Sequence, residues 1–290
     1  MQATIVLLFC FLCVSLQLGK SFNQVSFRYK RNLVPLFSDS TDSDAQIPSD
    51  TWEESFNTDK NTRTEDLKSE MLQLISSSDR GQSADMFLNE RISSLITELE
   101  GLNPTSSLFE SSLLQGDWNL LYANDDLTRS SPFFWAFKKA LKGIDDPLQS
   151  KALADSIFSF TDMDFLGLKS IGDCIQSFES ESLVSKVRIM INPVGSSLMT
   201  TTSSYEMIPD DGLLVKLTVE KTEVKDSTIA SLLPSFLDAS KFLSFPSGTA
   251  LEAVRADSSV VYMRMSYLDD SLRIVKNEED DKTFVFSRMS

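Results

Sequence analysis

Hydrophobic and polar positions alternate with two different periods along the chain, and the period changes near residue 116. Between residues 64 and 101, apolar residues recur every three or four positions, which predicts two amphipathic helices separated by a break at Gly81. Thr64 and Ser83 are the expected N-caps of these helices. From residue 116 to 288 apolar and polar residues mostly alternate, which predicts β-strands joined by short turns.

The strand region contains about eight segments suited to antiparallel pairing. Such strands form either a closed barrel that can hold one small ligand or a sandwich filled by side chains, and periodicity does not separate the two. Short helices are expected after Pro132, after Pro147 and over residues 226–237. The predicted fold class is therefore mainly β (α+β).

The first 63 residues carry targeting signals and a linker rather than a fold. Residues 1–21 hold an apolar run typical of a signal peptide and too short for a membrane span of about 20 residues. Residues 22–37 are basic and free of acids, as in transit peptides. Together they resemble the bipartite plastid leader of algae with complex plastids, and secretion with a basic propeptide is the alternative. Residues 38–63 predict a disordered acidic linker, which leaves 64–290 as the folded domain.

The net charge of the chain changes the list of expected partners. It is −15 at pH 7, and the pI is about 4.5. Nucleic-acid binding rests on the neutralisation of phosphates by Lys and Arg, so an acidic protein of this kind is not expected to bind DNA or RNA. The same acidic charge argues against docking on anionic membranes through a polybasic patch.

The chain contains no His, which excludes Ser-His-Asp and Cys-His nucleophiles and His-ligated metal or haem sites. Cys174 is the one cysteine outside the leader, so an internal disulfide or a Cys-ligated cluster in the folded domain is also excluded. We expect Cys174 to be a small buried residue. No cofactor, no metal and no catalytic residue is predicted.

Four blocks occur in an order that resembles the plastid lipid-associated protein family, also called fibrillins or plastoglobulins. The blocks lie between residues 71 and 288: the first contains "DRG" (79–81) and "LNPT" (102–105), the second contains "GDWNLLY" (116–122), the third is "SSPFFWAF" (130–137) and the fourth contains "YLDDSLRIVK" (267–276). The resemblance implies a lipocalin-like antiparallel β-barrel of about eight strands, preceded by the helix pair. It also implies a protein that coats plastoglobules or thylakoid margins and that is associated with carotenoids, prenylquinones and other apolar lipids.

Lipocalin-like barrels close one end with the indole of a Gly-x-Trp motif, over which an Arg from the last strands lies. In this chain the resemblance assigns that role to Gly116, Trp118 and Arg273, with Arg264 as the second choice for the arginine. A guanidinium over an indole contributes about 0.5–2 kcal/mol. We interpret the pair as structural closure rather than as a ligand contact.

The ligand pocket is expected to be apolar with few polar groups. Its predicted lining is Leu120, Tyr122, Val187, Ile189, Met199, Leu217, Met263 and Met265. The alternative is that these residues fill a dry core. Tyr205 and Tyr267 are candidates to hydrogen-bond a polar head group.

Phe133, Phe134, Trp135 and Phe137 cluster within five residues and are followed by lysines. An aromatic helix flanked by Lys is suited to lie on a membrane or lipid-body surface. The alternative is a helix that plugs the barrel with its rings turned inward.

Asp269 and Asp270 resemble an acid–base pair, but neighbouring residues of a strand face opposite sides. We therefore predict a turn in which Asp269 accepts backbone hydrogen bonds.

The favoured function is a non-enzymatic lipid-binding and structural protein of the plastid. Its expected partners are an apolar isoprenoid ligand and a lipid-body or thylakoid surface. Two alternatives stay open: an interaction module that partners an isoprenoid biosynthetic enzyme, and a lipocalin-type enzyme that acts on an apolar substrate.

Overall fold

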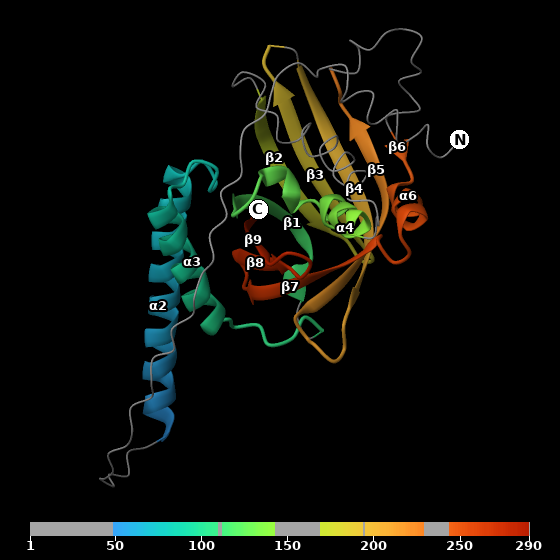
Figure 1. Ribbon diagram of the computed structural model, residues 1–290. Helices are drawn as coiled ribbons and strands as arrows, with labels where there is room; N and C mark the ends of the chain where they lie inside the picture. The colour runs from blue at the N-terminus through green and yellow to red at the C-terminus, as the bar shows by residue number, and fades with distance from the viewer. Residues whose placement is uncertain (1–48, 110–111, 143–168, 194, 229–243, 290) are drawn as a thin grey trace, which may run out of the picture. The chain divides into compact units, whose positions relative to one another are not determined.

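The computed structural model describes residues 49–109, 112–142, 169–193, 195–228 and 244–289 (Figure 1). The chain divides into two compact units, Met1–Arg63 and Thr64–Ser290, and the second contains all the described strands. The elements in chain order are α2 (Ser49–Ser77), α3 (Met86–Gly101), η1 (Ser112–Leu114), β1 (Gly116–Ala123), η2 (Leu127–Ser130), α4 (Pro132–Leu141), β2 (Lys169–Phe178), β3 (Ser182–Ile191), β4 (Gly195–Met207), β5 (Leu214–Lys225), β6 (Ser244–Phe245), α6 (Ser247–Val254), β7 (Val260–Leu268), β8 (Leu272–Asn277) and β9 (Lys282–Arg288).

Eight of these strands form one antiparallel sheet that closes in a ring. Hydrogen-bonded neighbours follow the order β4-β3-β2-β1-β9-β8-β7-β5, and β4 also pairs with β5. The short β6 adds to β5 alone. Closure removes the unpaired edges that an open sheet would leave. The predicted fold class is confirmed, because the described strands close on themselves instead of stacking as two separate sheets.

β2 to β5 continue beyond the ring. β1 pairs with β2 only from Gly116↔Phe178 to Asn119↔Ile175, and β7 pairs with β5 only between Leu214 and Thr218. The remaining parts of these four strands pair with one another and run away from β7, β8 and β9 (Figure 1). We call this part the strand extension, which comprises residues 169–174, 187–191, 195–199 and 222–225.

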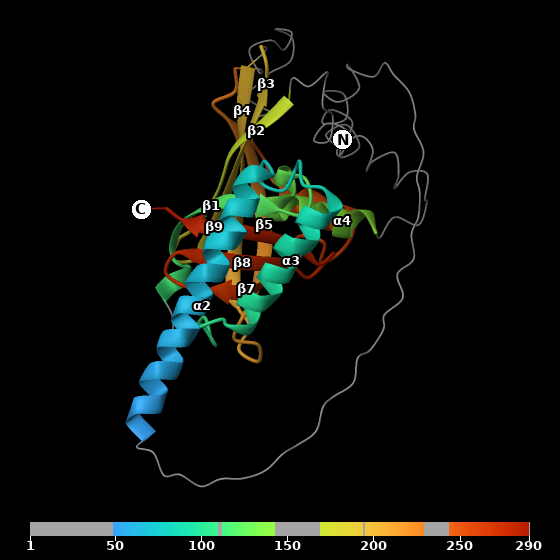
Figure 2. The ribbon, with the colours of Figure 1, turned by 90° about the vertical axis from the view of Figure 1, so that its left-hand side faces the viewer.

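The helix pair covers the outer face of β1, β7, β8 and β9 (Figure 2). Its buried residues are Leu67, Met71, Ile75, Ile92, Leu95, Ile96 and Leu99, and the strands contribute Tyr122, Tyr267, Leu272, Ile274 and Val285. Burial of each large apolar side chain contributes about 1.5–3 kcal/mol. This second core, separate from the core inside the ring, attaches the helices to the sheet.

Both helices begin at other residues than the sequence predicts. α2 begins at Ser49 instead of after Thr64, so residues 49–63, which were expected to be a disordered linker, are helical. The N-cap of α3 is Asp85 instead of Ser83, since its carboxylate accepts a hydrogen bond of 2.8 Å from the backbone nitrogen of Leu88.

The DRG turn between α2 and α3 connects the helix pair to β2. Asp79, Arg80 and Gly81 all adopt positive φ angles, of 47°, 59° and 92°. The Arg80 guanidinium donates hydrogen bonds to the carbonyl oxygen of Gly172, at 2.9 Å, and to that of Ile171. The turn therefore holds two helices and a strand in one fixed arrangement.

The LNPT block binds the end of β7. The side-chain oxygen of Asn103 accepts from the backbone nitrogen of Leu268 at 3.1 Å, and the Thr105 hydroxyl donates to the Leu268 carbonyl at 2.7 Å. Both backbone groups of the last β7 residue are thereby satisfied by this loop.

Asp269 lies in the turn between β7 and β8, and the turn prediction is confirmed. One carboxylate oxygen accepts from the backbone nitrogens of Ser271 and Leu272, at 2.8 and 2.7 Å. The other accepts from the Tyr267 hydroxyl at 2.6 Å and lies 2.5 Å from the Lys68 ammonium of α2. Burial alone would raise the pKa of Asp269, but these contacts outweigh it and hold that pKa below its usual value.

Several predictions fall on residues outside the described ranges. They concern the signal and transit segments, the helix after Pro147 and most of the insert over 226–237. Within the described ranges, no helix is both long enough and apolar enough to cross a membrane.

Gly81→Ala is expected to lower the free energy of unfolding by about 2 kcal/mol or more. A Cβ at this position would lie 2.6 Å from the Ala123 carbonyl oxygen and 2.6 Å from the Tyr122 ring, and φ would remain at +92°. Urea unfolding followed by circular dichroism measures the change.

Gly101→Ala is the matched control, since a Cβ there meets nothing within 4 Å. It should leave the stability unchanged or raise it by about 0.4–1 kcal/mol. Equal effects of the two substitutions would contradict the tight packing of the DRG turn.

Candidate functional site

Trp118 is buried in the core inside the ring. Gly116 enters β1 with φ of +108°, which favours glycine, and two residues later the Trp118 side chain is fully buried. The indole nitrogen donates to the Leu114 carbonyl at 3.0 Å, so its one polar group is satisfied.

The guanidinium of Arg273 lies over this indole inside the ring. Its Cζ atom is 5.0 Å from the ring centroid of Trp118, 5.0 Å from that of Phe178 and 4.3 Å from that of Phe286. Nη2 donates to the side-chain oxygen of Gln176 at 2.7 Å. The arginine of the expected pair is therefore Arg273, and it contacts three rings instead of one.

A second arginine, Arg288, lies with its Cζ 4.4 Å from the centroid of the same indole. It donates to the carbonyl oxygens of Gln115, at 2.7 Å, and of Leu113. The sequence analysis missed Arg288, although the strand register places it directly beside Trp118. Arg264, the second choice for the closing arginine, forms ion pairs with carboxylates elsewhere on the surface.

The buried charge of Arg273 has no acidic counterpart among the described residues. Burial lowers the pKa of Arg273 well below its usual value, and the nearby positive charge of Arg288 lowers it further. Arg nevertheless remains protonated in proteins. A cation is thus enclosed at the Trp118 end of the ring.

Seven of the eight predicted pocket residues belong to the core inside the ring. Six are buried in one cluster, and Met199 is partly buried against it. The six are Leu120, Val187, Ile189, Leu217, Met263 and Met265.

Tyr122 is the exception, and its predicted place in the pocket is corrected. The register between β1 and β9 shifts between Leu120 and Tyr122, so the strand bulges there and the next side chains change sides. Tyr122 packs under the helix pair, where its hydroxyl donates to Asn89 of α3 at 3.3 Å. Tyr267, a candidate polar handle, also faces the helix pair.

A row of polar side chains crosses the inner face of the sheet. Successive strands pair Trp118 with Gln176, Gln176 with Ser185, Ser185 with Thr201, and Thr201 with Thr222. We call Gln176, Ser185, Thr201 and Thr222 the polar row, and all four are buried. Alternation along β4 places Thr201 on the same inner face as Met199. Thr222 of β5 faces inward because the β4–β5 register shifts by one residue after Val219, which the sequence pattern does not show.

The polar row anchors the segments that enter the ring. The amide nitrogen of Gln176 donates to the Ser130 carbonyl at 2.8 Å, and the Ser131 hydroxyl donates to Thr201 at 3.1 Å. Ser130 and Ser131 immediately precede α4, so these bonds position that helix.

α4 does not present its aromatic rings to the surface. Phe133, Phe134, Trp135 and Phe137 are all buried in the core inside the ring. The Trp135 ring stacks on Phe284 of β9 with centroids 5.7 Å apart. The predicted lipid-surface contact is therefore wrong, and the alternative, a helix whose rings are turned inward, is correct. The physical reason is that the apolar side chains inside the ring bury the aromatic surface of α4.

Cys174 is buried on the inner face of β2. Burial raises the pKa of its thiol to about 12, so it is not a reactive thiolate at neutral pH.

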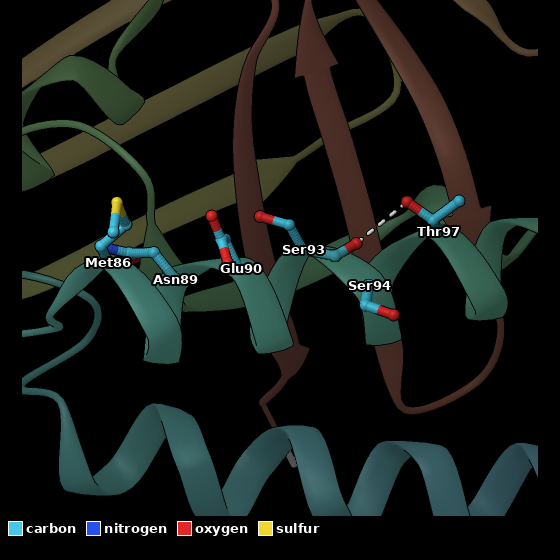
Figure 3. A pocket seen from close by; sticks show the side chains of 6 residues that line it. All are labelled: Met86, Asn89, Glu90, Ser93, Ser94 and Thr97. Carbon is cyan, nitrogen blue, oxygen red and sulfur yellow. Dashed lines mark hydrogen bonds between the residues drawn. The ribbon is translucent and has the colours of Figure 1, made fainter. Parts of the chain in front are cut away.

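Two surface hollows lie outside the ring and do not match the predicted apolar pocket. One of about 640 Å³ runs along α3, and its lining beyond Met86 is polar: Asn89, Glu90, Ser93, Ser94 and Thr97 (Figure 3). A second hollow, of about 420 Å³, lies beside α2, β1 and β9. Its lining includes the apolar residues Leu72, Leu121, Leu272 and Met289 together with charged residues.

The family model PAP_fibrillin matches residues 65–287. The chain belongs to the plastid lipid-associated protein (PAP/fibrillin) family. No curated protein and no solved structure is significantly similar to the chain. The match extends from Glu65 of α2 to Ser287 of β9, and the family supports a plastid lipid-associated structural protein. PAP/fibrillin proteins are in general structural rather than enzymatic, and the family implies a location in the plastid.

The family blocks correspond to the contacts that hold this PAP/fibrillin chain together. The DRG turn binds β2, the LNPT loop binds β7, and the Gly-x-Trp block seals the ring. The YLDDSLR block supplies both Asp269, which binds α2, and Arg273 inside the ring. The resemblance is thus explained by structural constraints at four places.

Phe134→Ala is expected to lower the free energy of unfolding by about 3–5 kcal/mol, as for other fully buried aromatic residues. Phe87→Ala, at a residue that is 74% exposed on α3, should change it by less than about 0.5 kcal/mol. Chemical denaturation of both variants decides between an inward and an outward α4. A Phe134→Ala protein as stable as the wild type would show that the rings do not pack in the ring interior.

Proposed function

We propose that the ring of this plastid protein holds or shields an apolar isoprenoid such as a carotenoid or a prenylquinone. The observation that carries the proposal is that all eight strands of a closed ring contribute apolar side chains to one inner core. An eight-stranded ring is of a size that can enclose one small ligand. Membership of a plastid lipid-associated family supports a lipid as that ligand.

Loading of the purified protein with a plastid lipid extract tests this proposal. The full-length protein is incubated with the extract, repurified by gel filtration and extracted with organic solvent, and the extract is analysed by absorbance and mass spectrometry. We expect one lipid class to be enriched, at about one molecule per chain. Protein never exposed to lipid is the control, and an extract with no enriched lipid would contradict a ligand-holding ring.

The place of the protein on plastoglobules or thylakoids is proposed to depend on the start of α3. Met86 and Phe87 are 67% and 74% exposed, which makes them the two most exposed large apolar side chains in the described part of the chain. Adjacent exposed apolar residues of this kind mark surfaces that bind a lipid surface or another protein. Because the rings of α4 are buried, this pair replaces α4 as the candidate lipid contact.

The double substitution Met86→Asp with Phe87→Asp should reduce flotation of the protein with triacylglycerol droplets at least about tenfold, since burial of two carboxylates in lipid is costly. The melting temperature should stay within about 2 °C, because both side chains are exposed. Phe109→Asp, at another exposed aromatic residue, is the matched control and should float like the wild type. Unchanged flotation of the folded double variant would exclude this contact.

The same surface supports a second candidate function, an interaction module for an isoprenoid biosynthetic enzyme. The hollow along α3 begins at Met86 and continues with polar side chains, as in many protein–protein contacts (Figure 3). If the double variant retained flotation but lost a copurifying enzyme, this second function would be favoured.

A further inference from the structure

Arg273 has hydrogen-bonding capacity that the protein itself does not use. Its side chain is 0% exposed, and its only hydrogen bond among the described residues runs from Nη2 to Gln176. Nε and Nη1 have no hydrogen-bond partner among the groups that the structure describes. Buried donors on a charged group are rarely left without an acceptor, because an unsatisfied donor keeps the full cost of its removal from water.

The charge of Arg273 is also uncompensated. The charged group that acts on it is another cation, Arg288, and no described carboxylate pairs with it. Contacts with three aromatic rings offset part of the cost of burying the charge. The cost of burying an ion without an opposite charge is larger, so these rings do not fully replace an anion.

Gln176 does not compensate for the missing anion. It is neutral, and its amide nitrogen is already engaged with the Ser130 carbonyl, which fixes the orientation of its oxygen toward Arg273. The polar row therefore presents the guanidinium inside the ring while its remaining N–H groups stay available to an acceptor from outside the chain.

The inner face next to the polar row is apolar. One step further along the strands, toward the strand extension, Cys174 pairs with Val187 and Val187 with Met199. Beyond them, Ile171 pairs with Ile189. Ser197, which pairs with Ile189, is a polar residue on this otherwise apolar face. A ligand with its head group at Arg273 would thus have mainly apolar side chains beside its chain along the strand extension.

We propose that Arg273 binds the carboxylate of a long-chain acid whose apolar tail lies along the inner face of the strand extension. This inference rests on the proposed function, that the ring holds an apolar ligand, and narrows that ligand to one with an acidic head group. A carboxylate supplies both the missing negative charge and acceptors for Nε or Nη1. A neutral carbonyl supplies only an acceptor, and a hydrocarbon supplies neither.

Two fluorescent probes that differ only at the head group test the proposal. The full-length protein is titrated with cis-parinaric acid and with its methyl ester, at mildly alkaline pH where the carboxyl group is ionised. We expect the acid to bind at least about tenfold more tightly than the ester. Arg273→Gln should remove this difference and leave the affinity for the ester unchanged.

Arg288→Gln is the matched control, because Arg288 contacts the same indole but donates to backbone carbonyls of the chain. It should retain the preference for the acid. If Arg273→Gln fails to fold, Gln176→Glu gives the second test, since a carboxylate placed beside Arg273 should abolish the preference for the acid by occupying the guanidinium.

The outcomes distinguish a failure of the role of Arg273 from a failure of the proposed function. Equal affinity of the wild type for acid and ester would overturn the role of Arg273 while the lipid-holding ring stands. A preference that persists in Arg273→Gln would likewise overturn it. Binding of neither probe would contradict the proposed function together with this inference.

Discussion

The burial of a positive charge inside an apolar ring constrains the structure around Trp118 and Arg273. Trp118, Phe178 and Phe286 surround the Arg273 guanidinium, and Gln176 accepts one of its hydrogen bonds. Because a buried cation is tolerated only where its surroundings are arranged for it, these contacts fix the relative positions of β1, β2, β8 and β9. The same Gln176 positions the segment before α4, so the closed end and the inserted helix depend on one side chain.

The helix pair outside the ring is held by polar contacts at its ends and by an apolar core between them. The DRG turn places a guanidinium on the backbone of β2, and Lys68 reaches the carboxylate of Asp269 in the β7–β8 turn. The LNPT loop completes the end of β7. These polar contacts fix the position of the helix pair along the sheet, and the apolar core holds the helices against it.

The helices and strands with a clear hydrophobic periodicity were predictable from the sequence. The contact between Trp118 and Arg273 was predictable from the resemblance to the family. The face of the sheet on which each side chain lies was not predictable. A bulge after Leu120 moves Tyr122 out of the ring, and a bulge after Val219 of β5 turns Thr222 toward the inside of the ring. One residue of slippage reverses a strand face, and no local pattern reports it. The orientation of α4 was undecidable for another reason, since an aromatic helix has the same composition whether its rings meet lipid or a protein core.

The most direct test of the account is a crystal structure of the protein with a bound long-chain carboxylate. The account predicts a carboxylate oxygen about 3 Å from Nη1 or Nε of Arg273, with the chain along β2, β3 and β4. A ligand seated in either surface hollow, with the guanidinium still contacting only the three rings and Gln176, would contradict it.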